Sequence, residues 1–421
     1  MQVYDNIAIE DVLMLPTKTL QNYLFSVDNY LPKVKKEFSS ICGRKITVFT
    51  QEFWTSKQRQ ASSIHEISYR ACFKPQLPSY FITRLSKPGD VVYDPFSGRG
   101  TTVIEAALLG RNIIANDANP LSAILSRPRI NPPTIKEVES RFNTIPYKKG
   151  LKADIDLSMF YHPDTESELV SLRNYLIARK KNKKEDFIDE WIRMVATNRL
   201  TGHSTGFFSV YTLPPNQAIT PQKQIKINKT LNQFPPYRNT KEIIQKKTIQ
   251  LTLRLSPEEI INLKRASENA IFLSDDARKT ASIPDSSVKV TVTSPPFLDI
   301  VQYNEDNWLR CWFNNIGVDI GAPKITMEKT VEKWAQVMLG ALTELYRITK
   351  KGGWVAFEVG EVRNGKIKLD EHIVPLGFEA GFTCEAVLIN EQKFTKTANI
   401  WGVKNNISGT NSNRIVLFQK A

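Results

Sequence analysis

Residues 91–117 constrain the fold of this chain more than any other part of the sequence. Val91–Tyr93 is a short apolar run typical of a β-strand, and a glycine-rich turn at residues 97–100 follows it. Thr101–Leu109 is typical of a helix, and a second apolar run then leads to Asp117. A strand, a tight turn, a helix and another strand in this order predict the opening of a parallel α/β sheet.

Later segments continue the same α/β rhythm. Val288–Thr293 alternates β-branched residues and stops at a double proline, as a strand does. A helix over Val331–Thr349 is expected to lead into a strand at Trp354–Glu358. Two further apolar runs, Cys384–Ile389 and Arg414–Gln419, can complete the sheet. Residues 1–60, by contrast, are expected to be irregular or mixed.

The middle of the chain interrupts this rhythm. Ser167–Lys184 is expected to be helical and ends in a basic run. Residues 191–256 carry ten Lys or Arg and one acid, Glu242, and they are rich in Pro, Gln, Asn and Thr. We expect an extended, poorly regular surface that follows phosphates and presents amide side chains to base edges. A solvated insertion without a ligand is the alternative.

The whole chain is strongly basic. Its 421 residues include 57 Lys or Arg and 43 Asp or Glu, a formal net charge of +14. This excess favours a polyanionic partner, most simply a nucleic acid. A soluble enzyme from a lysine-rich proteome would also fit the charge alone.

The remaining composition excludes several classes of protein. The four cysteines and four histidines are scattered, so neither a metal site nor a disulfide framework is expected. The chain has no apolar run of about 18 residues and no signal peptide. We therefore expect a cytoplasmic or nucleoid-associated protein without a membrane partner.

The turn after the first strand is suited to a nucleotide-like cofactor. Gly98 and Gly100 let a ligand approach the backbone closely. An acid, Asp94, stands at the strand end, where a pyrophosphate would be repelled but an amino group would be held. S-adenosylmethionine has an α-amino group, a positive sulfonium and no phosphate. Asp117 is placed to accept hydrogen bonds from ribose hydroxyls. For the turn alone, a purely structural role is equally open.

Two motifs carry a family resemblance. The segment Asp94–Thr102, with its continuation to Arg111 and Asn116–Pro120, resembles the cofactor segment of the amino-group DNA methyltransferases. Ser294–Phe297 is similar to the catalytic tetrapeptide of that family, Asp/Asn/Ser-Pro-Pro-aromatic. The resemblance implies a Rossmann-like methyltransferase sheet, mostly parallel with one antiparallel strand, and S-adenosylmethionine as cofactor without a metal. The implied cofactor contacts are Phe73, Asp94, Phe96, Gly98, Gly100, Thr101, Asp117 and Asp276.

The resemblance also implies how the tetrapeptide would act on the target amine. An exocyclic amine conjugated to a base is a poor nucleophile, because its lone pair is delocalised into the ring. Ser294 Oγ and the carbonyl of Pro295 would accept hydrogen bonds from that amine and favour a more tetrahedral nitrogen. Pro295 and Pro296 fix the backbone. Phe297 would stack on a base extruded from the duplex.

The resemblance divides the chain into three parts. Residues 61–130 and 270–421 are expected to form the catalytic domain, and residues 131–269 an inserted target-recognition region. Residues 1–60 form an N-terminal extension whose role is open, and it could share in recognition. The expected DNA contacts in the insertion are Lys223, Lys226, Lys229, Lys246 and Lys247.

The target base stays open between related possibilities. Ser at the first tetrapeptide position favours cytosine N4 in duplex DNA, and adenine N6 is the alternative. An RNA-directed enzyme and a catalytically silent specificity partner are more distant options. A separate cognate restriction endonuclease is a possible partner, and the recognition sequence cannot be read from the chain.

Overall fold

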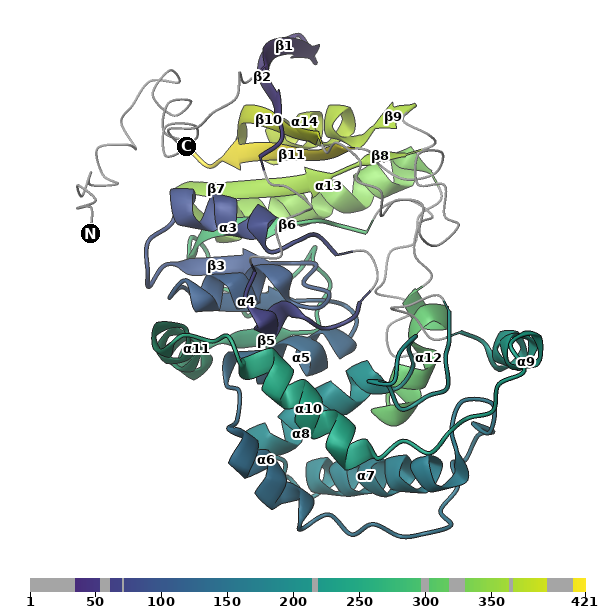
Figure 1. The fold of residues 1–421 in the computed structure, drawn as a ribbon. Coiled ribbons are helices and arrows are strands. Elements are labelled where there is room, and N and C mark those ends of the chain that lie inside the picture. Colours follow the sequence, from purple (N-terminus) through teal and green to yellow (C-terminus); the bar gives the residue numbers. More distant parts are fainter. Residues whose placement is uncertain are drawn as a thin grey trace.

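A large twisted sheet organises the protein (Figure 1). The computed structural model describes residues 35–53, 61–69, 72–213, 219–296, 303–317, 330–362, 366–391 and 412–421. Within these residues nine strands form one sheet in the order β1-β2-β10-β11-β7-β6-β3-β4-β5. The strands are β1 (Lys35–Ile41), β2 (Arg44–Gln51), β3 (Val91–Asp94), β4 (Asn112–Asn116), β5 (Ile271–Leu273), β6 (Val288–Thr293), β7 (Thr349–Val359), β10 (Thr383–Glu391) and β11 (Ser412–Gln419).

The direction of the strands confirms the predicted fold class. From β5 through β4, β3 and β6 to β7, each strand runs parallel to its neighbour. β11 is antiparallel to both β7 and β10, as the resemblance implied for one strand. The carboxyl ends of β3, β4, β6 and β7 therefore meet at one edge of the sheet, where ligands bind in folds of this kind.

Helices cover both faces of the sheet. α3 (Gln76–Leu85), α4 (Thr101–Leu108) and α11 (Pro257–Asn269) pack on one face, and α13 (Val331–Ile348) and α14 (Leu369–Glu379) on the other. Side chains alternate between these two cores: Trp354 and Ala356 of β7 face the first, whereas Val355 and Phe357 face the second. Strands that are apolar on both faces are typical of a parallel sheet between two helical layers.

The hairpin of β1 and β2 corrects one expectation. Residues 1–60 are expected to be irregular or mixed, with no strand assigned, but β1 and β2 pair antiparallel and β2 adds to β10 in parallel. Ile46 and Val48 of β2 are buried in the same core as α13 and α14. Part of the N-terminal extension thus belongs to the sheet, because its β-branched residues alternate inward. Residues 1–34 and 54–60 lie outside the described residues.

The inserted region contains several helices. Between β4 and β5 lie α5 (Leu121–Ser126), α6 (Ile135–Phe142), α7 (Pro163–Lys181), α8 (Phe187–Arg199), α9 (Pro221–Thr230) and α10 (Thr240–Thr252), followed by α11. The helix expected at Ser167–Lys184 is confirmed as α7, whereas the expectation of a poorly regular surface over residues 191–256 is wrong, because α8, α9 and α10 lie there. Some of the residues that suggested loops are helix starts. Thr220 and Asn239 accept hydrogen bonds from the first turns of α9 and α10, and Pro221 occupies the first turn of α9.

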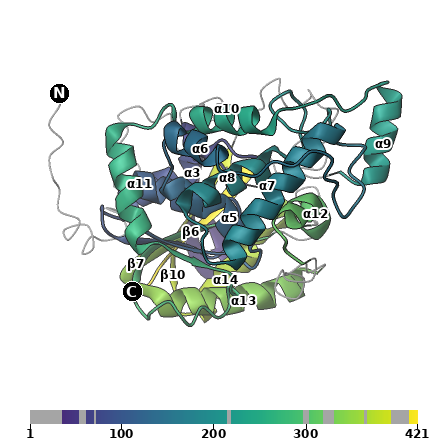
Figure 2. The same ribbon diagram turned by 90° about the horizontal axis from the view of Figure 1, so that it is seen from below.

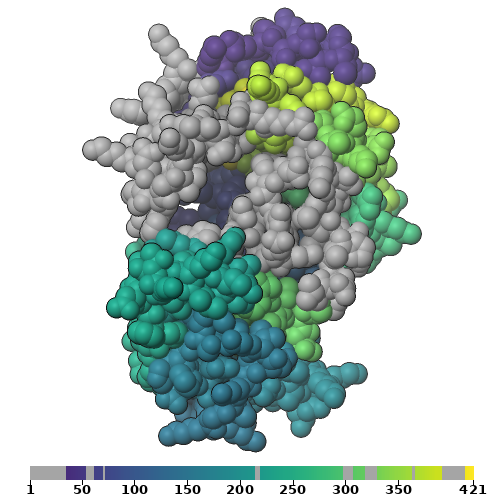
Figure 3. Space-filling view, turned by 90° about the vertical axis from the view of Figure 1, so that its right-hand side faces the viewer, coloured from purple at the N-terminus to yellow at the C-terminus, as the bar shows by residue number. Residues whose placement is uncertain are grey.

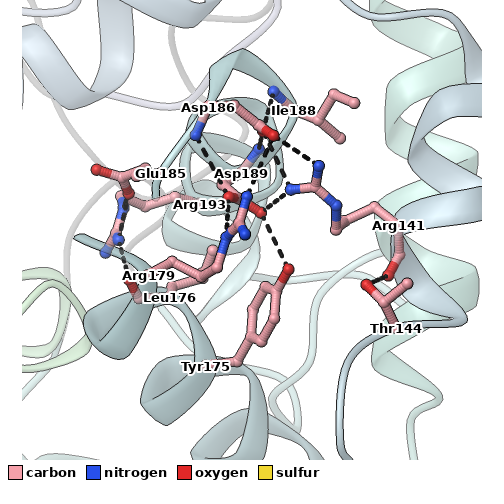
Figure 4. Close-up of polar contacts among 10 residues, drawn as sticks. All are labelled: Arg141, Thr144, Tyr175, Leu176, Arg179, Glu185, Asp186, Ile188, Asp189 and Arg193. Carbon is pink, nitrogen blue, oxygen red and sulfur yellow. Dashed lines mark hydrogen bonds and ion pairs between the residues drawn. The ribbon is translucent and has the colours of Figure 1, made fainter. Parts of the chain in front are cut away.

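A buried ion network holds the first inserted helices together (Figure 4). Asp189 of α8 is fully buried and pairs with Arg141 of α6 and with Arg179 of α7, whose Nε lies 2.7 Å from its carboxylate. Asp186, the N-cap of α8, binds the same two arginines. Three helices are therefore joined by one set of charges.

α12 (Tyr303–Phe313), which follows β6, lies beside the inserted helices rather than on the sheet (Figures 1 and 2). Among the described residues, none of the helices combines the length and apolar character needed to cross a bilayer.

Candidate active site

Asp94 and Thr293 join the two predicted motifs at the sheet edge. Asp94 ends β3, is 1% exposed, and accepts a hydrogen bond of 2.6 Å from the hydroxyl of Thr293 at the end of β6. The N–H of Phe96 also donates to this carboxylate, at 3.1 Å. Burial raises the pKa of Asp94 to about 7, although hydrogen bonds from Thr293, Phe96 and Thr102 oppose the shift. A carboxylate in this position would gain from a nearby cation.

The glycine turn has the backbone conformation that only glycine adopts easily. Gly98 and Gly100 have φ values of +51° and +78°. A Cβ on Gly100 would lie 2.5 Å from Cβ of Ser126, whereas one on Gly98 would meet only Tyr69, at 3.5 Å. Gly100 is therefore required for packing, and Gly98 keeps the turn open toward its outer side.

Asp117 closes the turn from the neighbouring strand. Its Oδ2 accepts from the N–H of Gly98 at 2.8 Å, and its Oδ1 accepts from the N–H of Asn119 at 2.8 Å. Burial raises the pKa of Asp117 to about 6, against these two donors. Each oxygen keeps acceptor capacity beyond its recorded bond, which suits a pair of hydroxyl donors such as those of a ribose.

Two arginines, of which Arg129 is fully buried, hold the glycine turn by hydrogen bonds that the sequence did not indicate. Arg129 is fully buried and donates to the carbonyls of Arg99 and Leu125, the latter at 2.8 Å. Arg99 donates to the carbonyl of Ile67 at 2.9 Å and to the hydroxyl of Thr101 at 3.1 Å. These bonds fix the turn and occupy the Thr101 hydroxyl.

The other expected cofactor residues, Phe73, Phe96 and Asp276, lie in three different surroundings. Phe73 and Phe96 are partly buried and pack against opposite cores. Asp276 follows β5, which pairs with β4, but its carboxylate is engaged by Arg278 at 2.5 Å. The backbone of its neighbour Asp275 exchanges two hydrogen bonds with the side chain of Asn116. The segment thus lies at the expected edge, with Asp276 turned to an ion pair.

The catalytic segment leaves the sheet next to Asp94. Ser294 and Pro296 are partly buried and Pro295 is buried. Trp334 of α13 donates its indole N–H to the carbonyl of Pro296 at 2.9 Å, which anchors the end of the segment. Thr102 at the start of α4 donates to the carbonyl of Val292 at 3.0 Å. Together with the bond from Thr293 to Asp94, two hydrogen bonds therefore connect the cofactor segment with the strand that leads to Ser294. Phe297 lies outside the described residues.

Glu358 is a site residue that sequence reasoning missed. It lies in β7, where Phe357 pairs with Thr293, and it is 7% exposed. Burial raises the pKa of Glu358 to about 7, and hydrogen bonds from Ser294 and Asn413 oppose this shift. The sequence signal was only an acid at the end of a predicted apolar strand. An acid that contacts the predicted catalytic serine is a candidate for its chemistry.

The predicted DNA-binding lysines divide into two groups. Lys223, Lys226 and Lys229 are exposed on α9, at the periphery of the molecule (Figure 2). Lys246 on α10 is exposed and lies 3.5 Å from Glu242. Lys247 is buried and donates to Gln250 at 3.1 Å, and burial lowers its pKa to about 8. Lys247 thus cannot contact a phosphate as expected, because α10 turns it inward.

The part of the chain that the structure describes contains no group of three or more His, Cys, Asp or Glu arranged to hold a metal ion. The polar groups gathered at the sheet edge are instead carboxylates, hydroxyls and backbone amides.

Comparisons with known proteins agree with this geometry. A family model described as DNA methylase, covering N6 and N4 methyltransferases, matches residues 21–122. The type II methyltransferase M.MjaII of Methanocaldococcus jannaschii is 29% identical over 118 residues, 27% of this chain and 22% of that protein. M.MvaI of Kocuria varians is 26% identical over 66% of this chain and 61% of its own length. M.BsoBI of Geobacillus stearothermophilus is 24% identical over 76% of this chain and 65% of its own. The chain therefore spans less than two thirds of each of these relatives.

Proposed function

From the premise that this chain resembles the amino-group DNA methyltransferases, we propose that it methylates an exocyclic amine of a base in duplex DNA with S-adenosylmethionine. The observation that carries the proposal is the hydrogen bond between Ser294, just after β6, and the buried Glu358 of β7. A serine held by a carboxylate at the end of β6 is suited to accept an N–H from a base.

The donor groups of the turn fit the proposed cofactor. Asp94 is buried with a raised pKa, so a cationic α-amino group would stabilise its charged form. Asp117 keeps acceptor capacity for ribose hydroxyls while it holds Gly98. When bound, S-adenosylmethionine supplies an electrophilic methyl group on sulfur.

The residues of this chain then act on the amine. The Ser294 hydroxyl donates to the Glu358 carboxylate, which leaves lone pairs on Oγ to accept an N–H of the base. The Pro295 carbonyl accepts the second N–H, and both bonds localise the nitrogen lone pair. As the new N–CH3 bond forms, the S–CH3 bond breaks with its electron pair left on sulfur, and the nitrogen becomes cationic. The Ser294 hydroxyl would accept the proton that this nitrogen loses while it passes its own proton to ionised Glu358. Correct placement of the two reacting atoms supplies much of the rate.

Within this function we favour cytosine N4 over adenine N6, since serine occupies the first tetrapeptide position. Mass spectrometry of nucleosides from DNA treated with the protein separates 4-methylcytosine from 6-methyladenine. A 6-methyladenine product would reject the cytosine assignment and keep the amino-methyltransferase. A restriction endonuclease acting separately is the partner that the type II relatives suggest.

The experiment that tests the function compares the protein with Ser294→Ala. Tritium transfer from labelled S-adenosylmethionine to DNA should be lost in the variant, while calorimetric binding of the cofactor is retained. Turnover like that of the unaltered protein would reject the role of Ser294. If the unaltered protein binds no S-adenosylmethionine, a catalytically silent DNA-binding partner becomes the better account.

A further inference from the structure

The loop after α8 is closed on itself by backbone contacts. Gly202 and Tyr211 form a β-bridge, and the N–H of Thr212 donates to the carbonyl of Gly202 at 3.0 Å. The N–H of Phe208 donates to the carbonyl of Arg199 at 2.9 Å, and that of Val210 to the carbonyl of Phe160 at 2.9 Å. The two ends of this loop, residues 200–212, therefore hydrogen-bond to each other and to the inserted region.

Close packing stiffens the same loop. A Cβ on Gly202 would lie 2.4 Å from the ring of Phe207, so the backbone and the ring are already in contact. The guanidinium of Arg199 stacks 4.0 Å from the centroid of the same ring. Phe207 and Phe208 are buried, at 6% and 0% exposure. The loop therefore presents its tip from a rigid base.

The tip itself is exposed and polar. His203, Ser204, Thr205 and Gly206 are all exposed, between the buried Gly202 and the buried Phe207. Imidazole and hydroxyl groups both donate and accept hydrogen bonds. Such groups can hydrogen-bond to base edges in a groove, whereas contacts to phosphates position a protein on DNA without reading its sequence.

The base of the loop is also joined to the candidate active site. Asn198, in the last turn of α8, accepts from the N–H of Ser68 at 3.1 Å and donates to its carbonyl at 2.8 Å. Ser68 precedes Tyr69, whose ring lies against Gly98. Thr197 accepts from the side chain of Asn314 at 2.9 Å, just after α12. The last turn of α8 thus contacts both the approach to the cofactor turn and the helix that follows the catalytic segment.

We propose that the tip formed by residues 203–206 reads the edges of bases next to the methylated one, and so determines the sequence at which the protein acts. This inference rests on the proposed function and adds the element that confers specificity. The buried base fixes the tip relative to Ser294, while the lysines of α9 hold the backbone at a distance. A merely structural turn would need its buried residues but not its exposed ones.

The test uses the full chain and the triple variant His203→Ala, Ser204→Ala, Thr205→Ala. His372→Ala, which alters an exposed histidine of α14, is the matched control. Each protein is incubated with a pool of random DNA duplexes, and the bound fraction is sequenced. Methylated positions are mapped in parallel on unmethylated phage DNA. Every altered side chain is exposed, although the His203 ring lies 6.1 Å from that of Phe207 and the Ser204 hydroxyl accepts from the N–H of Gly206 at 3.4 Å. Thermal unfolding of all three proteins therefore accompanies the binding assay and should show only small differences.

We expect the unaltered protein and the control to enrich the same motif, and the triple variant to lose preference at one or more positions by roughly tenfold. Cofactor affinity should not change. An identical motif in the triple variant, or no motif with the unaltered protein, overturns the inference. A motif that depends on the tip, without any methylation by the unaltered protein, would instead reject the proposed function and keep the inference.

Discussion

Glu358 is the side chain whose protonation should control the proposed chemistry most directly. Its carboxylate is buried against Ser294, and its pKa is raised to about 7. When protonated, it no longer accepts strongly from the serine and cannot receive a proton from the amine. Its ionised fraction grows as the pH rises through about 7, so the methylation rate should rise over the same interval.

Glu358→Gln should therefore lower the single-turnover methylation rate by roughly 100-fold at pH 8, in the range of a lost acid–base group, and remove the rise near pH 7. The amide keeps the size of the side chain, so cofactor binding should change little. Combining it with Ser294→Ala should give little further loss, because the two residues act as a unit. An unchanged pH profile in Glu358→Gln would contradict this role.

The two glycines of the turn should respond differently to alanine. At Gly100, a positive φ and a Cβ contact of 2.5 Å with Ser126 combine, so Gly100→Ala should destabilise the protein by about 2–4 kcal/mol. Gly98→Ala meets only the conformational strain, about 1 kcal/mol. Urea unfolding of both variants measures the difference. Equal losses would show that packing beneath Gly100 is not the cause.

At the residue scale, local motifs predicted some of the site and could not predict the rest. Asp94, Gly98, Gly100 and Ser294 stand in short patterns that the chemistry explains. Glu358 is distant from Ser294 along the chain, and only the pairing of β6 with β7 brings the two together. Such a contact depends on sheet order and register, which a single sequence does not contain.

At the element scale, the inserted helices owe their arrangement to Asp189. Removing its carboxylate leaves buried parts of Arg141 and Arg179 without one of their partners. Breaking a buried pair in this way is strongly destabilising. We therefore expect α6, α7 and α8 to depend on this one residue.

Asp189→Ala should cost about 3–5 kcal/mol and increase amide exchange in α6–α8 more than in β3, β4 and β6. Asp164→Ala is the matched control, because Asp164 also lies in a first helical turn but is exposed. The control should lose at most about 1 kcal/mol. A uniform increase in exchange across the sheet would show that the insertion does not unfold separately.

α7 was expected from the sequence, but the helices of residues 191–256 were missed for a physical reason. Pro, Thr and Asn favour turns, but they also favour the first positions of helices, and composition alone does not separate these roles. Along α9, the three lysines and Gln222 are exposed and so is Ile225, so the helix has little apolar periodicity to reveal it. β3, β4, β6, β7, β10 and β11 were predicted well because their sequences are largely apolar, whereas the more exposed strands β1 and β5 were not predicted.

At the scale of the whole molecule, the excess positive charge should act through particular surfaces. Lys223, Lys226 and Lys229 share the exposed helix α9, whereas Lys247 is enclosed. Figure 3 shows the inserted region and the hairpin at opposite ends of one face of the molecule. Long-range attraction of DNA would depend on the exposed group.

Replacing the three α9 lysines with glutamine should weaken DNA binding and reduce the slope of log K against log salt by up to about 3, one for each lost phosphate contact. Lys247→Gln should leave that slope unchanged, because its Nζ is engaged inside the protein. Fluorescence anisotropy at several salt concentrations measures both. Equal slopes for all three proteins would place the phosphate contacts elsewhere.

The β1–β2 hairpin also affects how copies of the protein meet one another. Because β2 pairs with β10, β1 is the outermost strand on that side of the sheet within the part of the chain that the structure describes. An open margin offers backbone groups to which another chain can add a strand, and charged side chains discourage such addition. Lys35, Lys36 and Glu37 are all exposed on β1. The hairpin thus covers the apolar strand β10 and places the charged strand β1 outermost. Charges on the outermost strand disfavour the edge-to-edge pairing of two copies of the sheet.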